Sequence, residues 1–503
     1  MPKWLLLTLL AGALNAAVIR GVVVENQTGK PLARALVVAQ PVAGTAGVTL
    51  SARTNSYGAF EFPAVPAGAY LVTASRRSFA PLQYGQKRWK AAGVPVVLEE
   101  AGAAALNFRL QRFGAITGTV VDENDVGLPE HEVTAYRNTR PPQLVARATT
   151  DDRGMYRLWG LEPGSYLVRT AAKKYDDDTY LPTFSHETSR VDEAHPTEVA
   201  LDQQSDQVNV RPFPGRLYTV AGQALMYPQA HVTLTLVSDV GSETTTSDGA
   251  GRFQFNPAAP GSYELYAQAQ GTTRGGGSLQ AGFIPLIVDR DRADTRIRLG
   301  NLADLQVLVE DTQGQPVDAA LFQLTARRKN LSGEGPLETL RTKQGHVPLL
   351  PGRWDLALAP ISAYYVAAFS GPKGDGVVRG RADGWNEILA TEGQMAVKFI
   401  LSPAPGLVHG TVTSNHLPAA GAPVYLEAFD LETRKRLTDL RTTRTDLAGK
   451  YQFYGLPPGN YRILSTFEYQ SPDPAAMEAS SPLPVKVEEA RDVSQDLELF
   501  VIR

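Results

Sequence analysis

The sequence predicts an all-β protein built from about five tandem β-sandwich modules that follow a secretory signal peptide. Three observations carry this prediction. A block of turn and aromatic residues occurs four times, apolar residues alternate with period two in many short segments, and glycine and proline interrupt the chain often. The 503 residues include 45 glycines and 35 prolines without a collagen-like period. A chain of this length is also too long for a single hydrophobic core.

The N-terminal segment, residues 1–17, has the features of a signal peptide. Lys3 supplies a positive charge, and the apolar run Trp4–Leu14 follows it. This run is short for a bilayer span, and no second long apolar run occurs. We therefore expect cleavage near Ala16 or Ala17, no membrane span in the mature chain, and a periplasmic or extracellular protein. The alternative is an uncleaved anchor or a buried first strand.

The repeated block contains two turns and the strand between them. In residues 445–463, TDLAGKYQFYGLPPGNYRI, a short polar starter and Gly449 form the first turn. Leu456-Pro457-Pro458-Gly459 forms the second turn, and Tyr461 begins the next strand. We expect Tyr461 to cover one end of the core while its hydroxyl binds a backbone group. The other copies pair Gly58 with Tyr70, Gly154 with Tyr166, and Gly251 with Tyr263.

Each module also has an opening strand that contains glycine and a closing strand of alternating apolar residues. The opening glycines are Gly21, Gly118, Gly222 and Gly410. The closing strands begin near Ala105, Gln207, Asp294, Ala396 and Asp496. The closing strands imply five modules, which we place at residues 18–112, 113–213, 214–300, 301–405 and 406–503.

The fourth module is degenerate because it lacks a clear copy of the block. It keeps only GHVPLLPGRWDLAL, in which Trp354 stands at the tyrosine position.

Helix signals are weak along the whole chain. Only residues 386–395 and 472–480 are expected to hold a helical turn.

The opening strand followed by T-D-x-x-G-x-Y-x-F-x-G-L-P-P-G-x-Y resembles the carboxypeptidase regulatory-like domain. This is a transthyretin-like (prealbumin-like) sandwich with Ig-like features, related to collagen-adhesin B-type repeats. The fifth module matches through Thr445, Asp446, Gly449, Tyr451, Phe453, Gly455, Leu456, Pro457, Pro458, Gly459 and Tyr461. The second matches through Thr150, Asp151, Gly154, Tyr156, Gly160, Leu161, Pro163, Gly164 and Tyr166. The resemblance implies a non-catalytic accessory or binding module of a secreted or cell-envelope protein.

Composition and motifs exclude several classes of function. The chain has no cysteine, so it has neither disulfides nor a lipidated N-terminal cysteine. The net charge of −3 gives no strong electrostatic footprint for nucleic acid. The sequence contains neither a G-x-S-x-G elbow nor an H-E-x-x-H motif. We therefore expect no catalytic residues, no metal site and no cofactor.

One motif keeps a metal-dependent hydrolase open as a less favoured alternative. His195-Pro196-Thr197-Glu198 is an H-x-x-E, the spacing with which zinc carboxypeptidases bind their metal. The same place in other modules holds Val94-Pro95, Ile284-Pro285 and Leu483-Pro484. We interpret His195 as a replacement for an aliphatic residue at the start of an ordinary strand.

The weak candidates for ligand binding are Tyr84 and Trp89, in the polar insert YGQKRWKAAG. Aromatic side chains in such an insert can stack on sugar rings or on a partner protein. The alternative is that the insert folds back over its own sandwich. Trp159 and Trp354 lie in repeat strands, where packing roles are expected, and the sequence assigns no role to Trp385.

Together these observations predict a non-catalytic, monomeric scaffold or spacer whose surfaces bind a cell-envelope protein or polysaccharide. A carbohydrate-binding accessory protein of polysaccharide breakdown is the alternative. The connections between modules are short, as at residues 212–220 and 402–410, and they favour a semi-rigid string of modules.

Overall fold

The structure is a computed structural model of the chain. It describes residues 17–501 except 43–47, 140, 177, 227–230, 272–277, 344, 372–377, 380–381, 431–439, 470–471 and 473. Apart from Ala17, the predicted signal peptide lies outside the described residues. The described part of the chain is almost entirely β-structure, which confirms the predicted fold class. No helix in this part is long and apolar enough to cross a membrane.

Separate hydrophobic cores divide the described residues into a row of β-sandwiches, which we call modules 1 to 5. The five cores lie within residues 17–110, 116–210, 220–299, 303–401 and 408–497. Each core takes buried side chains from two sheets, as expected for a sandwich. The predicted boundaries between modules stay predictions. Each core falls inside one predicted module, except that the first core also includes Ala17, the last residue of the predicted signal peptide.

Modules 1 and 2 have closely similar sheets, ordered β4-β1-β8 and β3-β2-β5-β6 in module 1, and β12-β9-β17 and β11-β10-β13-β16 in module 2. The elements of module 1 are β1 (Ala17–Glu25), β2 (Leu36–Pro41), β3 (Leu50–Arg53), β4 (Ala59–Val65), β5 (Gly68–Ser75), β6 (Leu82–Gln83), β7 (Val96–Leu98) and β8 (Ala103–Leu110). Those of module 2 are β9 (Gly114–Thr119), β10 (Glu132–Arg137), β11 (Gln143–Thr149), β12 (Met155–Leu161), β13 (Gly164–Thr170), β14 (Lys173–Tyr175), β15 (Asp178–Tyr180), η1 (Val191–Glu193), β16 (Thr197–Val199) and β17 (Gln204–Ser205).

Module 3 contains the sheets β21-β18-β24 and β20-β19-β22-β23-β25, and module 4 contains β30-β26-β35-β32-β33 and β28-β27-β31-β34. The elements of module 3 are β18 (Val220–Leu225), β19 (Thr233–Val237), β20 (Ser242–Thr246), β21 (Arg252–Gln254), β22 (Gly261–Gly271), β23 (Ser278–Val288), β24 (Arg292–Arg298) and β25 (Gly300–Asn301). Those of module 4 are β26 (Ala303–Asp311), η2 (Ala319–Leu321), β27 (Phe322–Asn330), β28 (Gly333–Glu334), β29 (Glu338–Leu340), β30 (His346–Leu349), β31 (Gly352–Pro360), β32 (Tyr365–Ser370), β33 (Val378–Arg379), β34 (Asn386–Ala390) and β35 (Gly393–Ser402).

Module 5 contains the sheets β37-β36-β40 and β39-β38-β41-β42, and β43 and β44 also pair with β36. Its elements are β36 (Gly406–Ser414), β37 (Leu417–Pro418), β38 (Pro423–Ala428), β39 (Arg441–Arg444), β40 (Lys450–Leu456), β41 (Gly459–Ser465), α2 (Pro474–Ala479), β42 (Leu483–Val487), β43 (Asp492–Ser494) and β44 (Leu497–Glu498).

The opening strand of each module pairs in parallel with a closing strand, as β1 does with β8 and β36 with β43 and β44. This pairing explains the opening glycine. A Cβ at Gly410 would lie 2.0 Å from the carbonyl oxygen of Gln495, and one at Gly118 would lie 2.0 Å from that of Val208. In module 5 the Tyr451 hydroxyl donates a hydrogen bond to the same Gln495 carbonyl.

The repeated block works through three local interactions. Thr445 Oγ1 accepts a hydrogen bond from the Ala422 N–H at 2.8 Å, which ties the block to the preceding hairpin. Asp446 Oδ1 accepts from the N–H of Lys450 at 2.8 Å, and Gly449 completes this turn with a φ of 75°. The Tyr461 hydroxyl donates to the Pro457 carbonyl at 2.7 Å, as predicted.

The same aromatic bond to the carbonyl four residues earlier recurs in every module. It is made by Tyr70 to Pro66, Tyr166 to Glu162, Tyr263 to Ala259 and, in module 4, by Trp354 Nε1 to Leu350. The indole of Trp354 therefore replaces the tyrosine of the block, which confirms the interpretation of the degenerate copy.

One of the two expected helical turns is wrong. Residues 386–390 form strand β34, whose side chains alternate between buried and exposed positions beside β31, and β35 begins at Gly393. The alternation explains the error, because it is the pattern of a half-buried strand. The second expectation is confirmed by α2, whose Met477 packs against Tyr425 of the module 5 sandwich.

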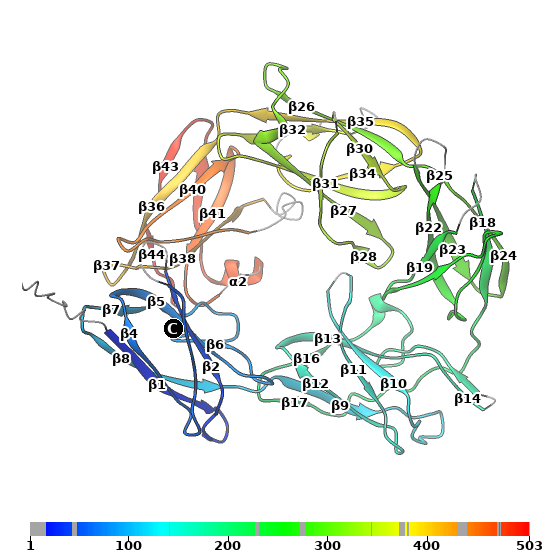
Figure 1. Cartoon of the computed structure of the whole chain (residues 1–503), viewed down its shortest axis with the longest axis horizontal. Helices are drawn as coiled ribbons and strands as arrows, with labels where there is room; N and C mark the ends of the chain where they lie inside the picture. The colour runs from blue at the N-terminus through cyan, green and yellow to red at the C-terminus, as the bar shows by residue number, and fades with distance from the viewer. Residues whose placement is uncertain are drawn as a thin grey trace, which may run out of the picture.

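The row of modules closes into a ring in which module 5 returns to module 1 (Figure 1). The N–H of Ala92 donates to the Phe467 carbonyl at 2.8 Å. Beside it, Glu468 is 5% exposed and forms ion pairs with Lys87 at 3.1 Å and with Arg88 at 3.4 Å. The polar insert of module 1 therefore forms the seam of the ring, and the string expected from the short connections is closed on itself.

Other contacts fix neighbouring modules around the ring. The Arg112 N–H donates to Asp202 at 2.7 Å between modules 1 and 2, and Arg328 stacks on Tyr266, 4.1 Å from the ring centroid, between modules 3 and 4. Tyr365 donates to Glu489 at 3.1 Å between modules 4 and 5. Across the ring, Gly333 of module 4 lies directly against Pro141 of module 2.

Candidate functional site

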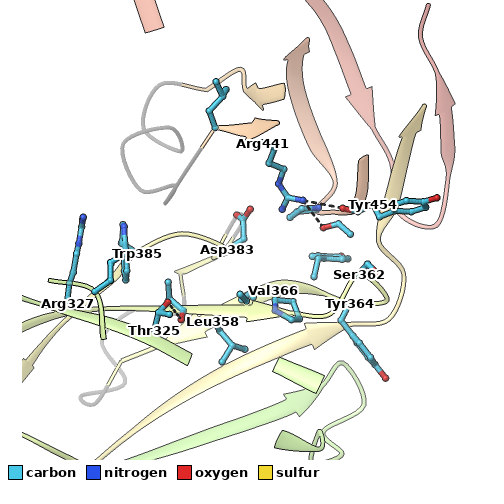
Figure 2. A pocket seen from close by; sticks show the side chains of 18 of the residues that line it. Thr325, Arg327, Leu358, Ser362, Tyr364, Val366, Asp383, Trp385, Arg441 and Tyr454 are labelled. Atoms are coloured by element: carbon cyan, nitrogen blue, oxygen red, sulfur yellow. Dashed lines mark hydrogen bonds between the residues drawn. The ribbon is translucent and has the colours of Figure 1, made fainter. Parts of the chain in front are cut away.

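A cavity of about 720 Å³ lies where modules 4 and 5 meet (Figure 2). Module 2 reaches the same cavity through Pro141. This volume is typical of sites that bind small molecules, and such sites often lie between domains. We call it the inter-module pocket.

Two paired strands of module 4 form one side of the inter-module pocket. β27 supplies Thr325 and Arg327, and the end of β31 supplies Ala357 to Pro360. Thr325 Oγ1 donates a hydrogen bond to the Ala357 carbonyl at 3.2 Å. Because β27 and β31 pair with each other along these residues, this side of the pocket is held by the module 4 sandwich.

Arg327 and Trp385 stand side by side at one end of the pocket (Figure 2). The Arg327 guanidinium lies 4.4 Å from the centroid of the Trp385 ring, a cation–π distance. The guanidinium is fixed in turn by Asp355, which is 2% exposed and lies 3.0 Å away, and by Glu334. The indole of Trp385 is therefore held in place by a buried ionic network.

The same network includes Lys329, which lies 3.2 Å from Asp355 and 2.6 Å from Glu387. Burial by itself would lower the pKa of Lys329, but its hydrogen bonds and charge interactions with these two carboxylates prevail. The pKa of Lys329 is therefore raised above its usual value. Lys329 therefore keeps its charge at neutral pH.

The turn before β34 presents Asp383 and Trp385 to the pocket. The side-chain amide of Asn386 donates to the carbonyls of Gly384 at 2.9 Å and Ala382 at 3.2 Å. These bonds fix the turn from beneath, because Asn386 is buried. Figure 2 shows Asp383 of module 4 beside Arg441 of module 5.

Module 5 supplies the opposite side of the pocket from β39 and the end of β40. The Arg441 guanidinium donates to the carbonyls of Tyr454 at 3.3 Å and Gly455 at 3.4 Å (Figure 2). Gly455 has a φ of 65°, and a Cβ there would lie 3.2 Å from Ser362 of module 4. The Tyr454 side chain is 52% exposed. This turn of the repeat is therefore one of the places at which module 5 meets module 4.

The pocket combines aromatic faces, hydroxyl groups and charges of both signs. Its lining includes the cations Arg327 and Arg441 and the carboxylates Glu334 and Asp383, so these charges balance. The described residues that line it include neither histidine nor cysteine. Such an arrangement can hold a polar ligand by hydrogen bonds.

The two ligand-binding candidates predicted from sequence lie elsewhere, in module 1. Tyr84 packs against the module 1 core, with its ring centroid 6.2 Å from that of Phe108. Trp89 makes an edge contact with Phe113 at 6.1 Å, and its buried Nε1 has no hydrogen-bond partner among the described residues. Trp89 also lines a smaller cavity of about 290 Å³. Ligand binding by these two residues stays a prediction.

The H-x-x-E motif lies on the surface of module 2. His195 and Glu198 are exposed, and the His195 ring lies 5.1 Å from that of His186. Among the described residues, no group of three or more histidine, aspartate or glutamate side chains has metal-binding geometry. The motif therefore gains one histidine neighbour and no further ligand within the described chain.

Sequence reasoning did not identify the residues of the inter-module pocket. Trp385 was left without a role, and Asp383 and Arg441 were not singled out. The repeat does contain one signal, because the aromatic–glycine pair Tyr454-Gly455 follows the same pattern as Trp159-Gly160. Which of the two pairs faces another module depends on the ring, and the sequence of a single module does not contain that information.

Comparison with known proteins agrees with the resemblance read from the sequence. The family model of the carboxypeptidase regulatory-like domain matches residues 18–111 and 115–210. A search of curated proteins found no match.

Solved structures with some similarity include those of bacterial pilins. A minor pilin of Streptococcus agalactiae is 13% identical, with 40% of this chain and 97% of that chain covered and a TM-score of 0.26. A streptococcal ancillary pilin is 10% identical, with 56% and 99% covered and a TM-score of 0.21. The major pilin subunit of Bacillus cereus is 13% identical, with 77% and 99% covered and a TM-score of 0.15.

Proposed function

We propose that this chain, whose first two modules are carboxypeptidase regulatory-like domains, is a non-catalytic exported scaffold that binds a cell-envelope ligand in the inter-module pocket. The observation that carries the proposal is the convergence of modules 2, 4 and 5 on one cavity. A spacer needs no such cavity, whereas a binding protein does. The ring is the scaffold, and the pocket is its binding surface.

The chemistry of the pocket supports a binding role. Arg327 is neutralised by Asp355 and Glu334, and Arg441 is bound to main-chain carbonyls. Both guanidinium groups are thus held by their partners and position the residues around them. Binding by hydrogen bonds needs only a preformed cavity with a few well-placed polar groups.

The location of the protein rests on the sequence. The signal-like segment at residues 1–17 supports export, and the absence of cysteine removes any dependence on disulfide formation outside the cytoplasm. Mass spectrometry of the protein from an expressing cell tests this part. We expect a chain that begins near Val18 outside the cytoplasm. A full-length chain retained in the cytoplasm would contradict export.

Binding is tested with the mature chain, residues 18–503, immobilised and exposed to cell-envelope extract. Arg441→Ala removes the group that shapes the module 5 side of the pocket. Arg147→Ala removes an exposed arginine from β11, the corresponding strand of module 2. We expect the wild-type chain and Arg147→Ala to retain the same protein or polysaccharide and Arg441→Ala to lose it. Retention by all three proteins argues against the pocket, and conversion of the retained component argues against a non-catalytic role.

A further inference from the structure

We propose that His186 and His195, on the surface of module 2, together bind one divalent transition-metal ion such as Zn²⁺ or Cu²⁺. Neither residue lines the inter-module pocket, so this inference goes beyond the proposed function and does not depend on it. The expectation of no metal site weighed His195 together with Glu198. The fold instead brings His186 next to His195.

The separation of the two histidine rings fits a shared ion. Their centroids lie 5.1 Å apart, and the ring planes are inclined by 46°. Zinc binds an imidazole nitrogen at about 2.1 Å, which places the ring centroid about 3.2 Å from the ion. Two rings at a tetrahedral angle on one ion then have centroids about 5 Å apart. The observed pair therefore has the spacing that a single ion requires.

Both rings are available to an ion. The two residues are exposed, and neither ring has a hydrogen bond or an ion pair with another described residue. Other histidines are already engaged. Both ring nitrogens of His131 have partners, the Tyr175 hydroxyl and the Ala171 carbonyl. The Nδ1 atom of His346 lies 2.9 Å from Asp304.

The backbone and its side-chain contacts hold the pair together. His186 has a φ of 66° in the tight turn that the Phe184 N–H closes on the Thr188 carbonyl at 2.7 Å. The Thr188 hydroxyl donates to Glu193 at 3.1 Å, and Glu193 ends η1, two residues before His195. This bond ties the turn of His186 to the segment of His195. An ion therefore meets two ligands that are already close together, at little cost in ordering them.

The ligand type and the local charge decide the class of ion. Imidazole suits zinc, copper and nickel, whereas calcium and magnesium take oxygen ligands. Residues 185–198 also contain four acidic residues and one basic residue, Arg190, and this negative charge favours a cation. The described residues offer no group of three or more metal-binding side chains. Water or an external ligand therefore completes the coordination.

The test measures binding of Zn²⁺ by calorimetry to the mature chain without a histidine tag, with Ca²⁺ as the comparison ion. The variants are His186→Asn and His195→Asn, and asparagine is chosen because it tolerates positive φ. The matched control is His416→Asn, because His416 is also exposed and has the same φ of 66°. Glu198→Gln tests the H-x-x-E alternative. Thermal unfolding shows that each variant is folded.

We expect the tightest binding to involve one Zn²⁺ per chain and to weaken about tenfold or more in His186→Asn and in His195→Asn, because even the outer partners of metal ligands are worth about 10- to 100-fold in affinity. The variants of His416 and Glu198 should bind as the wild-type chain does. Zn²⁺ should also protect His186 and His195 from modification by diethyl pyrocarbonate, as measured by mass spectrometry.

Absence of Zn²⁺ binding, or binding unchanged in both histidine variants, overturns the site. An equal loss in Glu198→Gln assigns the ion to the H-x-x-E motif and overturns the histidine pair. An equal loss in His416→Asn overturns the location in module 2. Displacement of Zn²⁺ by an equal concentration of Ca²⁺ overturns the class of ion.

Discussion

An aromatic residue followed by glycine and leucine ends the same repeat strand in modules 2 and 5, but the two turns lie in different surroundings. In module 2, Trp159 is 59% exposed, and nothing lies within 4 Å of the position of a Cβ at Gly160. In module 5, Gly455 lies against Ser362 of module 4, and Tyr454 lines the inter-module pocket. The repeat therefore determines the turn, and the neighbouring module determines whether the turn becomes part of a site.

The largest effect on stability is expected from a substitution that should destabilise modules 2 and 5 by the same amount. Gly410→Ala and Gly118→Ala place a Cβ 2.0 Å from a backbone carbonyl oxygen of the parallel closing strand. Neither backbone can move without breaking the strand pairing, so each change should destabilise its module by about 3 kcal/mol or more. Chemical denaturation of the mature chain measures this loss.

The control for this prediction is Gly261→Ala, because a Cβ at Gly261 makes only an ordinary contact with Tyr263 at 3.7 Å. This variant should unfold almost as the wild-type chain does. A small effect of Gly410→Ala would show that the opening strand is not held as described.

The next effect concerns the seam that fixes module 5 in the ring. Glu468→Ala leaves Lys87 and Arg88 without their partner at a position where the carboxylate is 5% exposed. Both cations are largely exposed, so we expect closure to weaken by only about 1–2 kcal/mol. Small-angle X-ray scattering should show a larger mean radius of gyration.

Glu310→Ala is the control, because Glu310 pairs with Lys398 at 3.0 Å within module 4. Its scattering should match that of the wild-type chain. An unchanged radius of gyration in Glu468→Ala would show that the ion pairs of Glu468 do not hold the ring closed.

A smaller effect, which depends on pH, is expected from the buried tyrosines of modules 2 and 5 and not from their exposed aromatic residues. Burial raises the pKa of Tyr156 and of Tyr451 above the usual value of about 10. Their unfolded forms ionise near pH 10, while the folded forms stay protonated. The contribution to stability is therefore complete below pH 10 and falls as the pH rises above it.

Stability curves from pH 8 to pH 11.5 test this expectation. Tyr156→Phe and Tyr451→Phe should each cost about 1 kcal/mol at neutral pH through a lost hydrogen bond, and should flatten the loss above pH 10. If stability falls above pH 10 as steeply in both variants as in the wild-type chain, this loss does not come from Tyr156 and Tyr451.

The smallest effect should come from the exposed aromatic residues themselves. Trp159→Ala and Tyr454→Ala should each change the free energy of unfolding by less than about 0.5 kcal/mol, because both side chains are more than half exposed. Thermal unfolding measures both. A strong loss of stability in Tyr454→Ala alone would make Tyr454 a packing residue of the module 4–5 junction.

The sequence predicted the parts of the structure that depend on neighbours in the chain. The turn at Gly449, the bond from Tyr461 to a carbonyl and the replacement of tyrosine by Trp354 all follow from local sterics and hydrogen bonding. The strand at residues 386–390 was missed, although its apolar alternation beside β31 is a usual strand signal.

The site could not be predicted in the same way. Asp383, Trp385 and Arg441 come from segments that meet only because two sandwiches pack together. In the sequence, the polar insert at residues 84–93 stands out only for its aromatic residues. In the structure, its Lys87 and Arg88 contact Glu468, almost 400 positions later in the chain. Contacts at such separations leave no periodic signal in one sequence.

The closed ring is the central claim, and a distance between modules 1 and 5 tests it most directly. The chain has no cysteine, so spin labels can be placed at Val97→Cys in β7 and Leu483→Cys in β42, both of which are exposed. Pulsed electron paramagnetic resonance on the mature chain should give one narrow distance distribution that broadens in Glu468→Ala. A broad distribution reaching long distances in the otherwise unchanged chain would show an open string of modules and would contradict the ring.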